Sequence, residues 1–142
     1  MKRSLIRENI IKTASHLFYQ KGYSLTGINE IIRETGIAKA TLYNHFKSKE
    51  DICVAYLEFK NSTFLKEIEA FCVKPPKCED QILGLFEFLK MFFKSKDFNG
   101  CWCINTVSEI PKENKNIRSE IQKQKKEFIA VSYTHLTLQT KA

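Results

Sequence analysis

The chain has 142 residues, of which 43% are apolar and 27% are charged, and its formal net charge is +7. This composition excludes a disordered tail and indicates one globular unit, or two small ones that share a core. Apolar stretches fall far short of the roughly 20 residues that cross a bilayer. The first residues, MKRSLIREN, lack the apolar core of a secretory signal. We therefore expect a cytoplasmic protein without membrane contact.

Positive charge is spread along the chain. Residues 1–60 hold ten Lys and Arg against six acids, and the remainder holds thirteen against ten. A basic balance favours a polyanionic partner, but the even distribution leaves the binding site unlocated. Composition alone therefore does not assign a nucleic-acid site.

The first third of the chain predicts three helices. The first covers residues 4–20 and is followed by Gly22, which suits a left-handed helix end. The second covers residues 26–35, with Thr26 as its N-cap, and the third covers residues 37–46. Two short helices joined by a tight turn at Gly36 form a helix-turn-helix pattern. The apolar stripes expected inside are Ile6, Ile10, Ala14, Leu17 and Phe18, then Ile28, Ile31 and Ile32, then Ile37, Leu42 and Phe46, with Lys12, Ser15 and Tyr19 pointing elsewhere.

Further helices are predicted after residue 47. Ser48 and Asp51 form a capping pattern for a helix that runs to about residue 72, where Pro75 and Pro76 prevent continuation. Asp80 would cap a helix to about residue 94, and residues 102–110 form another. Asn114 or Asn116 begins the last helix, and residues 131–138 alternate in a way that predicts a strand.

The cysteines carry no recognisable metal or catalytic pattern. The five cysteines are an odd number, which disfavours a closed disulfide framework, and Cys101 and Cys103 have the wrong spacing for a zinc knuckle. We interpret them as ordinary thiols, with redox sensing as the main alternative. The chain also lacks a glycine-rich phosphate loop and a nucleophile elbow. We therefore predict no catalytic residues, metal site or cofactor.

Residues 10–56 closely resemble the DNA-binding region of TetR/AcrR-type transcriptional regulators. The resemblance is carried by Ala14, Leu17, Phe18, Gly22, Tyr23, Thr26, Ile28, Ile31, Gly36 and the run KATLYNHFKSKED at residues 39–51. It implies an all-α fold, in which an N-terminal three-helix bundle with a helix-turn-helix precedes a C-terminal helical regulatory domain that is incomplete here. The implied domains are a DNA-binding domain at residues 1–47 and a partial ligand-binding and dimerisation domain at residues 48–130.

The resemblance also implies which residues contact DNA. A recognition helix presents its N-terminal residues to base edges, so Lys39, Ala40, Thr41 and Asn44 are the expected base contacts. Thr26, Tyr43, His45 and Lys49 match positions that the family uses against phosphate, whereas we interpret Lys47 alone as a solvated charge. Ala38 departs from the family, which usually has a capping Ser or Thr there, at a cost of about 1 kcal/mol.

For the remainder of the chain the resemblance implies a regulatory role. The expected function is a ligand-responsive repressor that binds a palindromic double-stranded DNA operator and is a homodimer when intact. An unidentified small-molecule effector would lie among aromatic side chains, for which Phe86, Phe92, Phe93 and Trp102 are the candidates. Residues 131–142, VSYTHLTLQTKA, resemble translated vector sequence, so we hypothesise that they are not native and that the true C-terminus is missing.

Two other classes of function remain open from the sequence. One is a thiol-dependent enzyme that uses a cysteine with His16 or His45, although no motif supports it. The other is a helical interaction module that does not bind DNA. Both differ from the leading interpretation in that neither requires steeply salt-dependent binding to duplex DNA.

Overall fold

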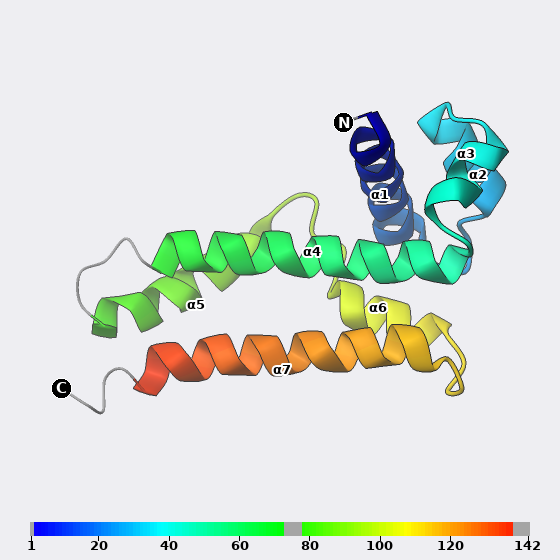
Figure 1. Cartoon of the computed structure of the whole chain (residues 1–142). Helices are drawn as coiled ribbons and strands as arrows, with labels where there is room; N and C mark the ends of the chain where they lie inside the picture. The colour runs from blue at the N-terminus through cyan, green and yellow to red at the C-terminus, as the bar shows by residue number, and fades with distance from the viewer. Residues whose placement is uncertain (1, 73–77, 138–142) are drawn as a thin grey trace. The chain divides into compact units, whose positions relative to one another are not determined.

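The computed structural model describes residues 2–72 and 78–137, and it describes the side chains of residues 3–71, 80 and 82–134. The described residues form seven helices and no strand (Figure 1). The helices are α1 (Lys2–Lys21), α2 (Ile28–Thr35), α3 (Lys39–His45), α4 (Lys49–Cys72), α5 (Cys78–Lys94), α6 (Trp102–Glu109) and α7 (Lys115–Thr137). The predicted all-α fold class is confirmed. None of these helices is both long enough and apolar enough to cross a membrane.

The chain divides into two compact units. Unit 1 comprises Met1–Lys60 and Asn99–Ile121, and unit 2 comprises Asn61–Phe98 and Gln122–Ala142. Unit 1 therefore holds α1, α2, α3, α6 and the first parts of α4 and α7. Unit 2 holds α5 and the remaining parts of α4 and α7.

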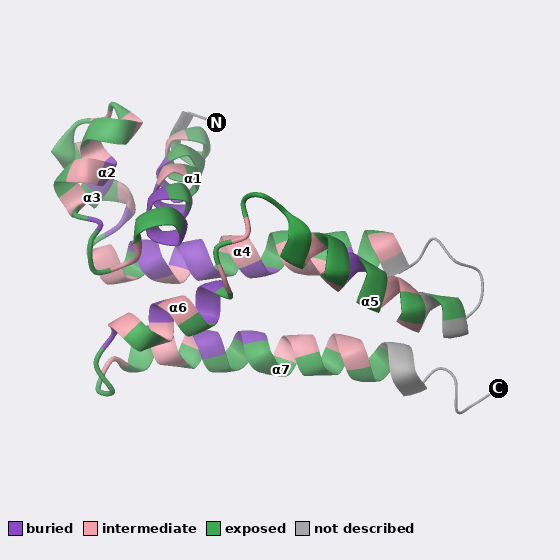
Figure 2. Cartoon of the chain, turned by 180° about the vertical axis from the view of Figure 1, so that it is seen from behind, coloured by how far each residue is buried: buried purple, intermediate pink, exposed green. Residues whose placement is uncertain are grey.

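The core of unit 1 forms between α1, the helix-turn-helix and the start of α4. Ile10, Ala14, Ile31 and Leu42 are fully buried, and the ring of Phe18 meets that of Tyr56 at 5.5 Å between centroids. Figure 2 shows the buried stretches of α1 and α4 in purple and the largely exposed surface of α3. The predicted inward stripe of the first helix is thus confirmed, apart from Ile6, which is half-buried.

The sequence interpretation of Ser15 and Tyr19 was wrong, because both side chains are buried. The Tyr19 hydroxyl donates to the Gly100 carbonyl at 2.9 Å and accepts from the Asn99 amide at 2.9 Å. The Asn99 side-chain amide in turn donates to the Tyr19 carbonyl at 2.6 Å. The turn before α6 therefore covers a second side of α1. Helical spacing within α1 cannot reveal this contact, because the partner lies about 80 residues away in sequence.

The turns before and after α2 depend on glycine. Gly22 and Gly36 have φ of +98° and +68°, a region that other residues rarely adopt. The prediction that Thr26 caps the second helix was wrong: Gly27 is the N-cap of α2 and makes no side-chain cap. The fully buried Thr26 hydroxyl instead donates to the Gly22 carbonyl at 2.8 Å, which stabilises the turn from inside.

The helices that follow the turn begin largely as predicted. Ala38 is the N-cap of α3 and offers no side-chain hydrogen bond, which confirms the missing cap. The Ser48 hydroxyl accepts from the Asp51 amide at 3.0 Å at the start of α4, and the Asn114 side-chain oxygen accepts from the Ile117 amide at 3.0 Å at the start of α7. Side chains thus fix both starts.

Unit 2 is built around aromatic side chains. Ile68 of α4 and Phe88 of α5 are buried and are surrounded by Phe64, Phe71, Leu85, Leu89, Phe92, Phe128 and Val131. Phe86 and Phe93 of α5, two of the aromatic residues expected around an effector, are instead 64% and 56% exposed. Asp80 lies within α5 rather than at its cap. The paired prolines predicted to end α4 lie outside the described residues.

The predicted strand at residues 131–138 was wrong, since α7 continues to Thr137. The Ser132 and Thr134 hydroxyls donate to carbonyls four residues earlier, at 2.9 and 2.8 Å, as Ser and Thr do within helices. Val131 packs against the aromatic core of unit 2. Tertiary packing therefore overrides the β propensity of this stretch.

Candidate nucleic-acid interface

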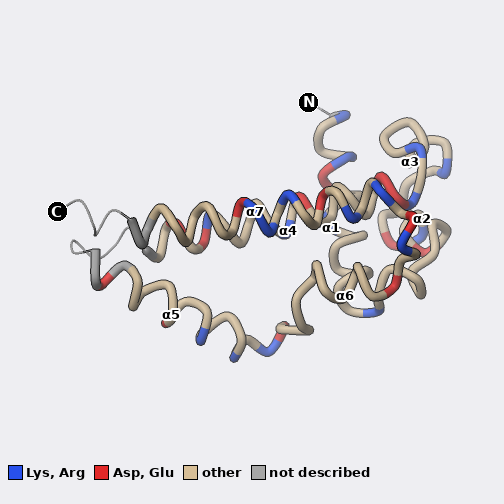
Figure 3. The backbone as a smooth tube through the Cα atoms, turned by 90° about the horizontal axis from the view of Figure 1, so that it is seen from below, with Lys and Arg blue, Asp and Glu red and all other residues tan. Residues whose placement is uncertain are grey.

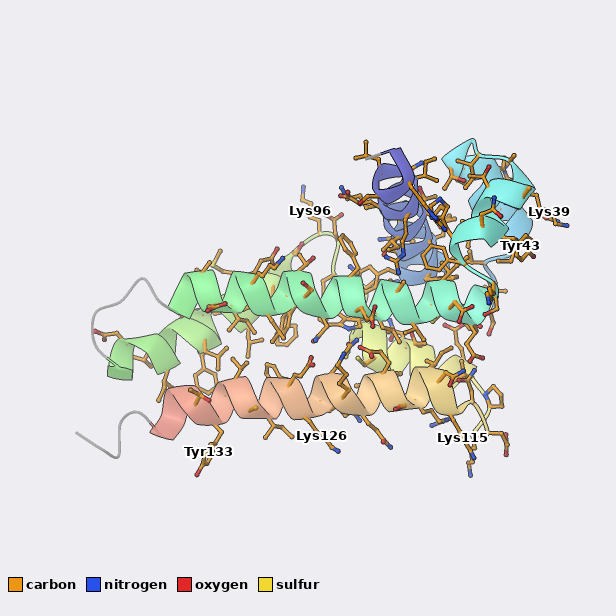
Figure 4. All side chains as sticks on the ribbon, viewed as in Figure 1. Lys39, Tyr43, Lys96, Lys115, Lys126 and Tyr133 are labelled. Atoms are coloured by element: carbon orange, nitrogen blue, oxygen red, sulfur yellow. The ribbon has the colours of Figure 1, made fainter. Side chains whose placement is uncertain are left out.

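The outer face of α3 presents the four residues expected to contact bases. Lys39, Ala40 and Asn44 are exposed and Thr41 is half-exposed. Lys39 projects away from α3 in Figure 4. On the opposite face Leu42 is fully buried and Phe46, which follows the helix, is 4% exposed. Two apolar anchors therefore hold a short helix so that its polar side and its N-terminal end face solvent.

The residues expected to contact phosphate have different environments. Tyr43 is 42% exposed on α3, and His45 is half-buried at the end of the same helix. The Lys49 ammonium instead lies 4.3 Å from the centroid of the Tyr23 ring. Its partial burial lowers the pKa of Lys49, an effect that the nearby Cys53 and Glu109 oppose. Thr26 is fully buried, so its hydroxyl does not reach a phosphate in this conformation.

A carboxylate from α6 holds the turn between α1 and α2. The two Glu109 side-chain oxygens accept from the backbone amides of Tyr23 at 3.3 Å and Ser24 at 2.7 Å. A Cβ added at Gly22 would lie 2.8 Å from a Glu109 carboxylate oxygen, so a larger residue there would displace the carboxylate. Sequence reasoning did not identify Glu109, because nothing local marks a contact that spans 85 residues.

A groove of about 630 Å³ lies beside the end of α3, within unit 1. Its basic lining comes from Arg7, His45 and Lys47, and its acidic lining from Asp51, Glu58 and Glu120. Phe46, Val54, Ala55, Asn116 and Ser119 complete it. The groove thus has side chains of both charges, and the basic ones come from α1 and from the end of α3. Among the three basic residues of the groove, only His45 was predicted from sequence as a site residue.

The four residues predicted to line an effector pocket belong to different units and differ in exposure. Phe86 and Phe93 are mostly exposed, whereas Trp102 is 7% exposed and belongs to unit 1. Phe92 alone joins the aromatic core of unit 2, where its ring lies 5.2 Å from that of Phe64. Spacing within α5 did not identify Phe88 as the buried position, because the partner rings come from α4 and α7.

Unit 2 also holds a polar pair that the sequence did not reveal. Asn61 is 8% exposed, and its side-chain amide donates to the Glu127 carboxylate at 2.7 Å. The neighbouring Gln124 is 3% exposed. Unit 2 therefore combines aromatic rings with a buried hydrogen-bonding group.

Comparison with known proteins agrees with this arrangement. The family described as "Bacterial regulatory proteins, tetR family" matches residues 10–56, which include the helix-turn-helix. The HTH-type transcriptional regulator LmrA of Bacillus subtilis (strain 168) is 31% identical over 131 residues, which cover 88% of this chain and 68% of LmrA. The chain belongs to the TetR family. This membership places it among transcriptional regulators rather than enzymes, as predicted.

Two further proteins resemble this TetR-family chain. The HTH-type transcriptional repressor NemR of Escherichia coli (strain K12) is 25% identical over 127 residues, which cover 88% of this chain and 64% of NemR. The crystal structure of a TetR-family transcriptional regulator from Streptomyces coelicolor superposes with a TM-score of 0.83 at 26% identity, over 90% of this chain and 68% of that one. The chain spans no more than about two thirds of the length of the curated relatives it matches.

The burial of Cys53 bears on the alternative of a thiol enzyme. Cys53 is fully buried, and burial raises the pKa of its thiol to about 12. A thiol with that pKa holds its proton at neutral pH and is a poor nucleophile. Cys53 is therefore unsuited to catalysis in this TetR-family chain.

Proposed function

We propose that this chain is a ligand-responsive transcriptional repressor that binds a palindromic DNA operator as a homodimer. The observation that carries the proposal is the exposed outer face of α3, which two buried anchors hold toward solvent. Residues 1–47 form the DNA-binding domain in this proposal, and residues 48–130 form the part that binds the effector and the second subunit. Such a regulator acts in the cytoplasm, where bacterial DNA lies.

Base reading belongs to the N-terminal part of α3. A helix in the major groove brings its first residues to base edges. Lys39 then donates to guanine, Asn44 pairs with adenine, and Ala40 or the Thr41 methyl contacts a thymine methyl. These side chains are exposed or half-exposed without rearrangement of the fold.

Phosphate contacts then position α3 on the duplex. Tyr43 and His45 lie on α3 and reach the strand directly. Lys49 contributes after its ammonium leaves the Tyr23 ring, against which it lies here. At the start of α2 the backbone amides replace the buried Thr26 hydroxyl, because Gly27 leaves that helix end without a side-chain cap.

The effector site belongs to unit 2 in this proposal. The rings of Phe64, Phe88, Phe92 and Phe128 offer apolar contact, and the pair Asn61–Glu127 offers a hydrogen-bonding group. This combination suits an aromatic compound that carries one polar substituent. Binding regulates DNA affinity only if the compound binds one arrangement of the two DNA-binding heads better than the other.

A homodimer follows from the palindromic operator, because two heads must read two half-sites. Unit 2 carries large apolar side chains that are exposed on α5 and α7, at Leu83, Phe86, Met91, Phe93, Ile129 and Tyr133. A second copy that covered part of this surface would gain stability from the hydrophobic effect.

A salt titration tests the proposal. A fluorescein-labelled duplex that carries the DNA upstream of the gene is titrated with the chain, and anisotropy is read at several salt concentrations. We expect binding whose log K falls linearly with log salt. A chain that ignores this duplex at low ionic strength overturns the proposal in favour of an interaction module. One hyper-reactive cysteine in an iodoacetamide assay at neutral pH would favour a thiol enzyme instead.

A further inference from the structure

Basic side chains of the helix-turn-helix region fall into two groups. Lys12, Lys21 and Arg33 each have a carboxylate partner, with Lys12 lying 2.7 Å from Glu8 and Arg33 lying 3.2 Å from Glu34. Within the described side chains, Arg7, Lys39 and Lys47 form no ion pair. Figure 3 shows basic residues on α3 and on the N-terminal part of α1. Basic side chains without a carboxylate partner in the described structure are therefore present on α1 as well as at α3.

Arg7 is held beside the end of α3 although it belongs to α1. Its guanidinium carbon lies 4.9 Å from the centroid of the Phe46 ring. The Phe46 side chain is 4% exposed and is one of the two anchors of α3. Stacking on a fixed ring restrains a long side chain that would otherwise be mobile. The charge of Arg7 is thus preorganised relative to the helix that reads bases.

The groove beside α3 limits where a polyanion can lie. Arg7, His45 and Lys47 form its basic lining, whereas Asp51, Glu58 and Glu120 form its acidic lining. The acidic side repels a phosphate strand, and the basic side attracts one. Within the groove, a duplex seated on α3 therefore meets attraction along the side formed by α1 and the end of α3.

We propose that Arg7 is a further phosphate-contacting residue, which binds the DNA backbone next to the bases read by α3. The inference rests on the proposed function, which it extends from the helix-turn-helix to α1. Lys47 adds positive charge on the same side of the groove without a fixed contact of its own. Arg7 positions the duplex and carries no base specificity, because phosphate contacts are independent of sequence.

Three variants of the full chain test this role on the labelled upstream duplex. Arg7→Gln removes the charge. Arg7→Lys keeps it, and Lys12→Gln removes a charge from the same helix that already has a carboxylate partner. We expect Arg7→Gln to weaken binding several-fold at moderate salt and to reduce the log–log salt slope by about 0.9 for each bound head. Arg7→Lys keeps the wild-type slope, and so does Lys12→Gln.

The outcomes separate this inference from the function on which it rests. Thermal unfolding of each variant shows whether Arg7→Gln loses binding through instability, which would lower affinity without changing the slope. An unchanged slope in Arg7→Gln, or an equal loss in Lys12→Gln, overturns the role of Arg7 and leaves the proposed function standing. Failure of the wild-type chain to bind duplex DNA overturns both.

Discussion

Leu42 and Tyr43 are neighbours on α3, but they differ in how far their side chains are buried. Leu42 is fully buried, whereas Tyr43 is 42% exposed. Because a short helix has little stability of its own, its position depends on the apolar side chains that anchor it. The residue that stabilises α3 and the residue proposed to contact DNA are therefore adjacent in sequence and can be substituted separately.

Substitution of these two residues distinguishes the roles. We expect Leu42→Ala to lower the free energy of unfolding by about 2–5 kcal/mol, because it removes a fully buried side chain. Tyr43→Ala should change it by about 0.5 kcal/mol or less, as is typical of surface sites. Urea unfolding followed by circular dichroism measures both. Equal losses in the two variants would contradict the burial described here.

The buried thiol of Cys53 and the half-buried phenol of Tyr23 predict that the protein loses stability at alkaline pH. Burial raises the pKa of Cys53 from 9.0 to about 12 and that of Tyr23 from 10.0 to about 12. Both groups bind protons more tightly in the folded state, so the stability that they contribute is complete below pH 9 and is lost as pH rises toward 12. Urea midpoints measured from pH 8 to about 11.5 should fall above pH 9. In Cys53→Ala the fall should begin nearer pH 10, and an onset that does not move would refute the contribution of Cys53.

At the scale of elements, the helix starts differ in how well they are capped. α4 and α7 begin with side-chain caps from Ser48 and Asn114, whereas α2 and α3 begin at Gly27 and Ala38 without any. Both uncapped residues have extended backbone conformations, with φ of −92° and −70°, as an N-cap requires. A capping side chain at either position could therefore stabilise the helix-turn-helix.

Serine at the two uncapped positions should stabilise the protein. Ala38→Ser should add about 0.5–1 kcal/mol to the free energy of unfolding, and Gly27→Ser a few tenths of a kcal/mol. No atom lies within 4 Å of a Cβ added at Gly27, so the substitution causes no clash. Thermal melts compare these variants with Ala130→Ser, an exposed position inside α7 that offers no cap. A gain in the control equal to that in Ala38→Ser would show that capping is not the cause.

Local sequence signals predicted most elements but not the contacts between distant ones. The helix ends at Gly22 and Gly36 and the capping serine at residue 48 are all decided by nearby residues. The burial of Tyr19, and the hydrogen bonds from the turn after α1 to Glu109, depend on partners at least 80 residues away in sequence. The strand predicted from residue 131 failed for the same reason, since packing in unit 2 keeps that stretch helical.

The candidate site likewise combines features that nearby residues decide with contacts between distant segments. The outward face of α3 follows from the spacing of Leu42 and Phe46, so its four residues were identified from sequence. Arg7 was not singled out from the sequence, because its contact with Phe46 joins α1 to the residue that follows α3. The exposure of the effector candidates could not be predicted, because the pattern of a single amphipathic helix does not show which of its aromatic side chains contact rings from other helices.

At the scale of the whole molecule, the two compact units carry different chemistry. Unit 1 holds an exposed recognition helix with unneutralised basic side chains beside it. Unit 2 holds an aromatic core and a hydrogen-bonded pair in which Asn61 is buried and Glu127 is partly exposed. Under the proposed function, unit 1 contacts the operator and unit 2 responds to a small molecule.

The central claim is that the outer face of α3 reads DNA bases, and a comparison of two duplexes tests it most directly. Affinities of the wild-type chain and Asn44→Ala are measured on the upstream duplex and on a scrambled duplex of equal length and composition. We expect the wild type to prefer the upstream duplex. Asn44→Ala should lose most of that preference, about 1–3 kcal/mol for each base pair read, while it keeps the wild-type salt slope. Full retention of the preference by Asn44→Ala would contradict the account.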